Sequence, residues 1–242
     1  ARDASQEEVP FTRAVLAMTE NIDWNVGRLL AAVDKLKLAE DTIVFYFSDN
    51  GPNSWRWNAG MKGRKGTVDE GGVRAPFLMR WKGRIPAGRK VPQIAGAIDL
   101  LPTFISLAGV KFQPPKPLDG RDLSPLILGQ KTEWPDRKIF SLQAKRVSVR
   151  TQRYRLDPAG NLYDMEKDPM QDRNIAAEQP AVAAELRAAG EYAASAGIRI
   201  GVEALNRYEN NFLNTVAQAK SIVDRADHPN IGFHIDLFHA YI

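Results

Sequence analysis

The sequence of 242 residues contains no cysteine. Disulfide bonds, thiolate metal ligands and cysteine nucleophiles are therefore excluded within these residues. Long apolar runs are absent too: no stretch approaches the roughly 20 residues needed to cross a bilayer, and the start, residues 1–6, lacks the apolar segment of a signal peptide. We therefore expect no membrane span. Localisation stays open, and a periplasmic or secreted location would follow if a leader preceded this segment.

Positive charge is modest overall but unevenly placed. The formal net charge is +4, yet the segment from Arg56 to Lys90 holds ten Lys or Arg residues against two acids, Asp69 and Glu70. Such a segment favours an anionic partner, with a solvated surface as an equal alternative. Because glycine-rich turns interrupt it, and no basic helix or aromatic RNA-reading motif is present, nucleic acid is not expected as a partner.

The first third of the chain has the pattern of an α/β protein. Apolar residues make up 44% of the sequence, enough to build a core. Between residues 12 and 37 they recur every three or four positions, which predicts a helix packed on a core. The apolar run Ile43–Phe47 predicts a strand buried on both faces. Further on, Asp99 is placed to cap a helix that stops at Gly109.

Short extended segments follow in the middle of the chain. Residues 138–142, 146–151, 154–157 and 162–164 have the composition of strands, and a turn rich in Asp, Pro and Gly precedes the last. They predict a small antiparallel sheet beside the main sheet.

The pattern changes near residue 190. Residues 198–203 and 231–236 read as strands, and the apolar stripe at 212–223 reads as a helix between them, so one β-α-β unit is predicted. No internal repeat relates it to the earlier part. We therefore predict three parts: 1–130 in an α/β layer, 131–188 in an antiparallel subdomain, and 189–242 as a separate β-α-β fragment.

Candidate chemistry in the larger part begins where the buried strand ends. Asp49 and Asn50 follow that strand, at the sheet edge where ligands of α/β proteins collect, and their oxygens suit calcium or magnesium. A simple turn is the alternative, since every neighbouring residue forms turns readily. Lys65 follows within a segment of five glycines in thirteen residues, 60–72, where the backbone can approach a ligand. An oxyanion between metal and ammonium fits this combination.

These motifs closely resemble the sulfatase family. The resemblance rests on Ser48–Pro52, then Gly63–Thr67 with Glu70–Pro76, in that order, and it extends to about residue 185. Further segments that match are Trp81–Gly88, Ile98–Thr103 with Leu107–Val110, Leu118–Arg121 and Leu162–Pro169.

The resemblance implies roles for particular residues. Asp49 and Asn50 would be metal ligands, usually for calcium, and Lys65 would bind the sulfate of the substrate and act in catalysis, with assistance from Arg64 and Lys62. The expected partner is a sulfated small molecule or carbohydrate. The formylglycine nucleophile of the family forms in a Cys/Ser-x-Pro-x-Arg motif, which these 242 residues lack. Two ligands fall short of the roughly 6 to 8 oxygens of calcium, so weak metal binding at best is expected.

The final part carries carboxylates with metal-site spacing. Glu203 and Asp236 each fall near the carboxyl end of a predicted strand, so two parallel strands would bring them to one barrel face. Acids that cap a helix or lie in surface loops are the alternative. The segments Glu203–Glu209, Leu213–Thr215 and Asp236–His239 resemble ketose 3-epimerases of the xylose-isomerase-like barrel family. That resemblance implies Glu203 as metal ligand and acid/base, Asp236 as ligand of manganese or another divalent ion, and Glu209 and His239 as sugar contacts.

The expected fold is thus a partial alkaline-phosphatase-like sulfatase sheet with a small antiparallel subdomain, plus one β-α-β unit of a TIM barrel. Three functions stay open: a sulfatase portion, a ketose 3-epimerase fragment, and a non-catalytic fusion or chimeric product. We favour the sulfatase because its resemblance covers most of the chain, although activity of this chain alone is not expected. The missing halves of either fold are conceivable partners.

Overall fold

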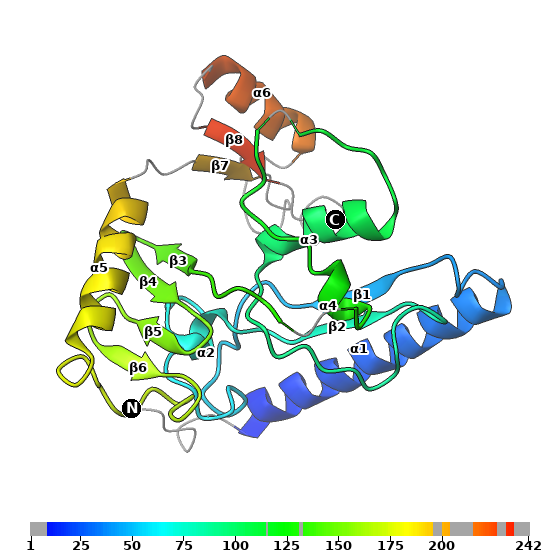
Figure 1. Cartoon of the computed structure of the whole chain (residues 1–242). Coiled ribbons are helices and arrows are strands. Elements are labelled where there is room, and N and C mark those ends of the chain that lie inside the picture. The colour runs from blue at the N-terminus through cyan, green and yellow to red at the C-terminus, as the bar shows by residue number, and fades with distance from the viewer. Residues whose placement is uncertain are drawn as a thin grey trace. The chain divides into compact units, whose positions relative to one another are not determined.

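The computed structural model describes residues 9–114, 116–130, 133–195, 200–203, 215–226 and 231–234. It divides into two compact units, Ala1–Gly190 and Glu191–Ile242, which are described separately. Figure 1 labels the elements of both units. The first unit contains α1 (Val9–Lys35), β1 (Val44–Phe47), α2 (Glu70–Val73), β2 (Phe77–Arg80), η1 (Ala97–Asp99), α3 (Leu100–Leu107), α4 (Ser124–Ile127), β3 (Ile139–Gln143), β4 (Arg146–Arg150), β5 (Tyr154–Leu156) and β6 (Leu162–Asp164), and α5 (Pro180–Ser195) continues beyond it.

The strand predicted at Ile43–Phe47 forms as β1, but the prediction that both its faces are buried is wrong. β1 pairs antiparallel with β2, and within the described residues this sheet has two strands. Phe45 is 41% exposed and Tyr46, on the opposite face, 38% exposed. Phe104 of α3 lies 4.9 Å from Phe45, ring centroid to ring centroid. The apolar run has the composition of a strand between two covering layers, and the described elements cover each face only in part.

Helix α1 confirms the helical period of its sequence, while its packing is looser than predicted. Val15, Val26 and Val33 are half-buried on one face, but no residue of the helix is fully buried. Salt bridges fix its end, because Asp34 pairs with Arg80 of β2 at 3.1 Å and with Lys82 at 3.3 Å. The helix therefore lies beside the β1–β2 pair with much of its apolar stripe exposed.

The small antiparallel sheet is confirmed. Its four strands follow the chain in the order β3-β4-β5-β6, each antiparallel to the next. Helix α5 runs alongside this sheet (Figure 1), and it contributes side chains to the same core. The fully buried members of that core are Val149, Leu156, Leu162, Ala183 and Leu186. The first turns of α5 thus belong to the first unit.

Asp99 precedes α3 as predicted, but its carboxylate does not cap that helix. No side-chain capping bond is present; instead the carboxylate accepts the backbone N–H groups of Gly96 at 2.8 Å and Arg121 at 2.7 Å. It also pairs with the buried Arg137 at 2.7 Å. A buried carboxylate requires such partners, because an unpaired charge inside the protein is costly. The stop at Gly109 is confirmed by its positive φ of 64°.

The second unit contains β7 (Ile200–Glu203), α6 (Val216–Ala226) and β8 (Ile231–His234). The two strands pair in parallel, with Glu203 opposite His234. The predicted β-α-β unit is therefore confirmed among the described residues. In the part of the chain that the structure describes, no helix combines the length and apolar character needed to cross a membrane.

Candidate functional site

The tip of β1 places Asp49 and Asn50 just beyond the last strand residue. Asp49 is exposed, and its carboxylate accepts the backbone N–H of Asn50 at 2.9 Å. The next residue, Gly51, donates its backbone N–H to the carbonyl of Gly72 at 2.9 Å. The strand tip is therefore attached to the end of the glycine-rich segment.

The glycine-rich segment returns to this tip at Lys65. The backbone N–H of Lys65 donates to the carbonyl of Pro52 at 2.9 Å, and the Arg64 guanidinium reaches the carbonyl of Asn53 at 3.5 Å. Both side chains are exposed. These bonds bring the backbone of the predicted sulfate-binding lysine next to the residues that follow Asp49 and Asn50.

Glycine is required where the strand tip meets the glycine-rich segment and where that segment folds back on itself. A Cβ on Gly51, at the strand tip, would clash with the carbonyl of Gly71. A Cβ on Gly71 would lie 2.5 Å from the carbonyl oxygen of Gly63 and 2.8 Å from that of Lys62, closer than real Cβ atoms approach. Gly63 itself has a φ of 83°, in the left-handed region. Gly63 and Gly71 thus let the glycine-rich segment fold back on itself, and Gly51 lets this segment approach the strand tip.

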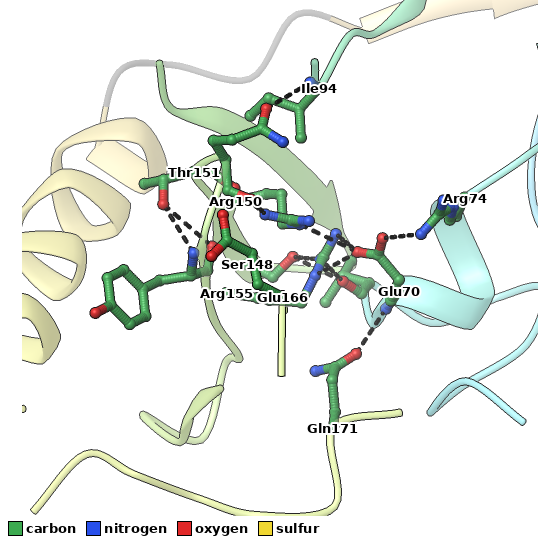
Figure 2. A network of polar contacts seen from close by, with 12 residues as sticks. Glu70, Arg74, Ile94, Ser148, Arg150, Thr151, Arg155, Glu166 and Gln171 are labelled. Carbon is green, nitrogen blue, oxygen red and sulfur yellow. Dashed lines mark hydrogen bonds and ion pairs between the residues drawn. The ribbon is translucent and has the colours of Figure 1, made fainter. Parts of the chain in front are cut away.

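A buried ionic cluster around Glu70 anchors the same segment to the antiparallel sheet (Figure 2). Glu70 is 5% exposed. Its Oε2 accepts hydrogen bonds from Nη2 of Arg155 at 2.8 Å and from Nε of Arg150 at 3.4 Å. Arg155 also donates to the carbonyl of Val68 at 2.8 Å, and Gln171 accepts the backbone N–H of Glu70 at 2.9 Å. These bonds therefore attach the loop that carries Lys65 to β4 and β5.

The charges in this cluster are mutually dependent. Burial opposes the charge of Glu70, but the guanidinium groups of Arg155 and Arg150 outweigh burial and hold the pKa of this carboxyl below its usual range. Burial likewise lowers the pKa of Arg150, with Glu70 acting in the opposite direction. The cluster keeps an ionised carboxylate inside the protein.

Lys62 forms a second anchor. Its ammonium donates to Asp157 at 2.8 Å and to the Tyr163 hydroxyl at 2.9 Å, and lies 3.5 Å from Asp69. Burial opposes the charge of Lys62, but the hydrogen bonds to Asp157 and Tyr163 outweigh it and raise its pKa above the ordinary value. Lys62 therefore joins the loop to the turn between β5 and β6, whereas the resemblance assigned it to the substrate.

Sequence reasoning missed both anchors. Glu70 was part of a motif without a role of its own, and Arg155 and Asp157 lay in a predicted strand and its turn. The available signal was the presence of charged residues in segments that also read as buried, since a buried charge requires a partner.

The donor set at the strand tip fits a hard cation only in part. Asp49 and Asn50 offer oxygen atoms, as calcium prefers, but calcium takes roughly 6 to 8 oxygens. Among the described residues no group of three or more His, Cys, Asp or Glu side chains could hold a metal ion. The described residues alone do not complete such a site.

In the second unit, Glu203 is the last residue of β7, at the strand end predicted for it. Glu209, Asp236 and His239 lie outside the described residues.

Three family models match the chain. The model described as Sulfatase matches residues 2–110, and the model described as N-sulphoglucosamine sulphohydrolase, C-terminal, matches residues 64–189. The model described as Xylose isomerase-like TIM barrel matches residues 158–242. The overlap at 158–189 belongs structurally to the first unit, because Leu162, Ala183 and Leu186 share the core of the antiparallel sheet.

Similar proteins are sulfatases. Steryl-sulfatase from Mus musculus is 42% identical over an alignment of 120 residues, which covers 46% of this chain and 19% of that protein. Arylsulfatase A from Homo sapiens is 35% identical over an alignment of 191 residues, which covers 64% of this chain and 37% of that protein. The crystal structure of Ps i-CgsB in complex with k-i-k-neocarrahexaose superposes with a TM-score of 0.65 and 26% identity, covering 72% of this chain and 41% of that one.

The fold is that of an α/β protein of the alkaline-phosphatase-like class, extended by a small antiparallel subdomain. The chain belongs to the sulfatase family. It spans between about a fifth and two fifths of the length of the relatives it matches.

Proposed function

We propose that the first unit is the sulfate-binding portion of a sulfuric-ester hydrolase. The observation that carries this proposal is the backbone contact between the strand tip and the glycine-rich loop, Lys65 to Pro52 at 2.9 Å. Lys65 supplies a compact positive charge that holds a sulfate oxygen. Arg64 adds a second cation on the same loop.

Asp49 and Asn50 contribute two oxygen ligands to a calcium ion, and the remaining oxygens come from outside the described residues. Calcium would supply a positive charge opposite Lys65, so that the sulfate is held from two sides. The role of Asp49 is to offer a carboxylate oxygen at the tip of β1.

The nucleophile of the reaction is not supplied by these 242 residues, because they contain no Cys/Ser-x-Pro-x-Arg motif. The roles of this chain are binding and orientation of the sulfate. We therefore expect no release of sulfate from nitrophenyl sulfate by the purified chain, since the nucleophile provides most of the rate enhancement.

The proposed substrate is a sulfated carbohydrate. Solved structures similar to this chain contain k-i-k-neocarrahexaose and D-glucosamine-2-N,6-O-disulfate, the second with a TM-score of 0.53 and 26% identity. The basic segment from Arg56 to Lys90 favours such an anionic ligand.

Calorimetric titration of the purified chain with inorganic sulfate, with and without calcium, tests the proposal. We expect weak binding that strengthens with calcium and disappears in Lys65→Ala. The control Lys111→Ala, which removes an exposed lysine outside the basic segment, should bind as the parent does. Equal binding by Lys65→Ala and the parent would remove Lys65 from the sulfate site.

A second candidate function concerns the final part of the chain. The parallel pair β7–β8 and the match to the Xylose isomerase-like TIM barrel model support a TIM-barrel fragment. We propose that this fragment derives from a metal-dependent ketose 3-epimerase. Glu203 and Asp236 would bind manganese or another divalent ion, and Glu209 and His239 would contact the sugar. One β-α-β unit does not close a barrel, so we expect no epimerase turnover from these residues alone. A non-catalytic fusion or chimeric product is the alternative proposal for this part. Manganese-dependent interconversion of fructose and psicose by the chain would establish epimerase activity instead.

A further inference from the structure

The loop between the strand tip and the glycine-rich segment displays two tryptophans. Trp57 is 48% exposed, and Trp55 is half-buried two residues earlier. An exposed indole ring leaves a large apolar surface in contact with water. A ligand that packs on this ring removes that surface from water, which favours binding.

The buried side chain of Asn58 fixes the conformation of this loop. The side chain of Asn58 is 1% exposed and donates to the carbonyls of Met61 at 2.7 Å and Gly63 at 2.9 Å, while its own oxygen accepts the backbone N–H of Gly60 at 3.1 Å. Because Asn58 follows Trp57 directly, these bonds fix the backbone that carries the exposed indole of Trp57. They also fix it against the segment that carries Lys65.

A cation adjoins the first tryptophan. The guanidinium carbon of Arg64 lies 5.6 Å from the centroid of the Trp55 ring, within the range of a cation–π contact. Arg64 also reaches the carbonyl of Asn53. The loop thus combines aromatic rings and positive charge immediately before Lys65.

We propose that Trp57, supported by Trp55 and Arg64, forms a saccharide subsite that stacks on the sugar ring of a ligand whose sulfate is held at Lys65. This inference rests on the proposed function for the sulfate. The apolar face of a pyranose ring carries C–H groups that pack on an indole, and the ring hydroxyls remain in water. Stacking does not depend on the sulfate, whereas the contact with Lys65 does.

That difference allows the two ideas to be tested separately. The full chain, labelled with 5-fluorotryptophan, is titrated to millimolar concentrations with k-i-k-neocarrahexaose and with the chemically desulfated hexasaccharide. The signal of Trp57 is assigned with Trp57→Phe. We expect this signal to shift with both ligands, and we expect Trp57→Ala to weaken both by about three- to tenfold. Trp57→Phe, which keeps an aromatic ring, should retain most of the affinity.

Trp24 provides a matched control. It is 60% exposed on α1, and the guanidinium of Arg28 lies 4.6 Å from its ring centroid, so it resembles the loop tryptophans in exposure and in its cationic neighbour. Trp24→Ala should leave both affinities unchanged.

Two results would overturn the subsite: a Trp57 signal that moves with neither ligand, or equal affinities of Trp57→Ala and the parent. A lysine variant, Lys65→Ala, separates this inference from the proposed function. It should weaken only the sulfated ligand. If it leaves the affinity for that ligand unchanged, the sulfate proposal fails while the stacking result stands on its own.

Discussion

Replacement of Arg155 by methionine should be the most damaging single change to the loop that carries Lys65. Arg155 is 3% exposed in its side chain and donates twice to Glu70, at 3.1 Å from Nε and 2.8 Å from Nη2. Removal of one partner from a buried pair costs about 3 to 5 kcal/mol, because the other charge stays buried. Arg150 and Arg74 remain at 3.4 Å from Glu70, so we expect the lower end, about 3 kcal/mol.

Tryptophan fluorescence during urea unfolding measures this loss in the first unit, because all five tryptophans lie before residue 135. Arg173→Ala is the matched control: its pair with Glu178 at 2.8 Å is exposed on both sides, and exposed pairs contribute less than about 1 kcal/mol. The double variant Glu70→Gln/Arg155→Met should regain part of the lost stability. A loss in Arg155→Met no larger than that in Arg173→Ala would refute the view that this cluster anchors the loop.

Two further predictions concern the same loop. Gly71→Ala should destabilise the protein by about 1 to 3 kcal/mol, because the added methyl group overpacks against the Gly63 carbonyl. Gly27→Ala, with open space around it on α1, should stabilise the protein by about 0.5 to 1 kcal/mol. Urea unfolding of both variants checks this, and equal effects would contradict the tight contact between Gly71 and Gly63. Burial opposes the charge of Asp157, but its bonds to Lys62 and Asn161 lower its pKa. The stability it contributes is therefore present above the unfolded carboxyl pKa, about 3.9, and is lost as the pH falls through the lower folded pKa. Unfolding at a series of pH values should show the deficit of Asp157→Asn shrinking below about pH 4, and a constant deficit would exclude this ion pair as the cause.

Local pattern was enough to predict most elements. The strands that became β3 to β6 alternate and are separated by turn formers, and the β-α-β order of the final part follows from strand and helix periods. The meeting of the strand tip with the segment around Lys65 was also foreseeable, since Gly51 and Gly71 permit close approach of the two backbones.

Contacts between distant charges were not foreseeable from the sequence. Glu70 and Arg155 are 85 residues apart, and nothing in either segment specifies the other as its partner. The exposure of Phe45 was missed for another reason: its apolar strand indicates the need for covering layers, but a strand pattern does not say which segments provide them. The periodicity of a segment indicates whether it prefers a helix or a strand. The burial of its residues depends on the segments that pack around it.

The position of the Lys65 ammonium in a crystal of the chain grown with calcium and low-millimolar sulfate tests the central claim most directly. We expect one sulfate in contact with Nζ of Lys65, on the same side of the β1 tip as the side-chain oxygens of Asp49 and Asn50. A lysine side chain directed to the opposite face of the loop, with no anion between it and the strand tip, would contradict the assignment of this site.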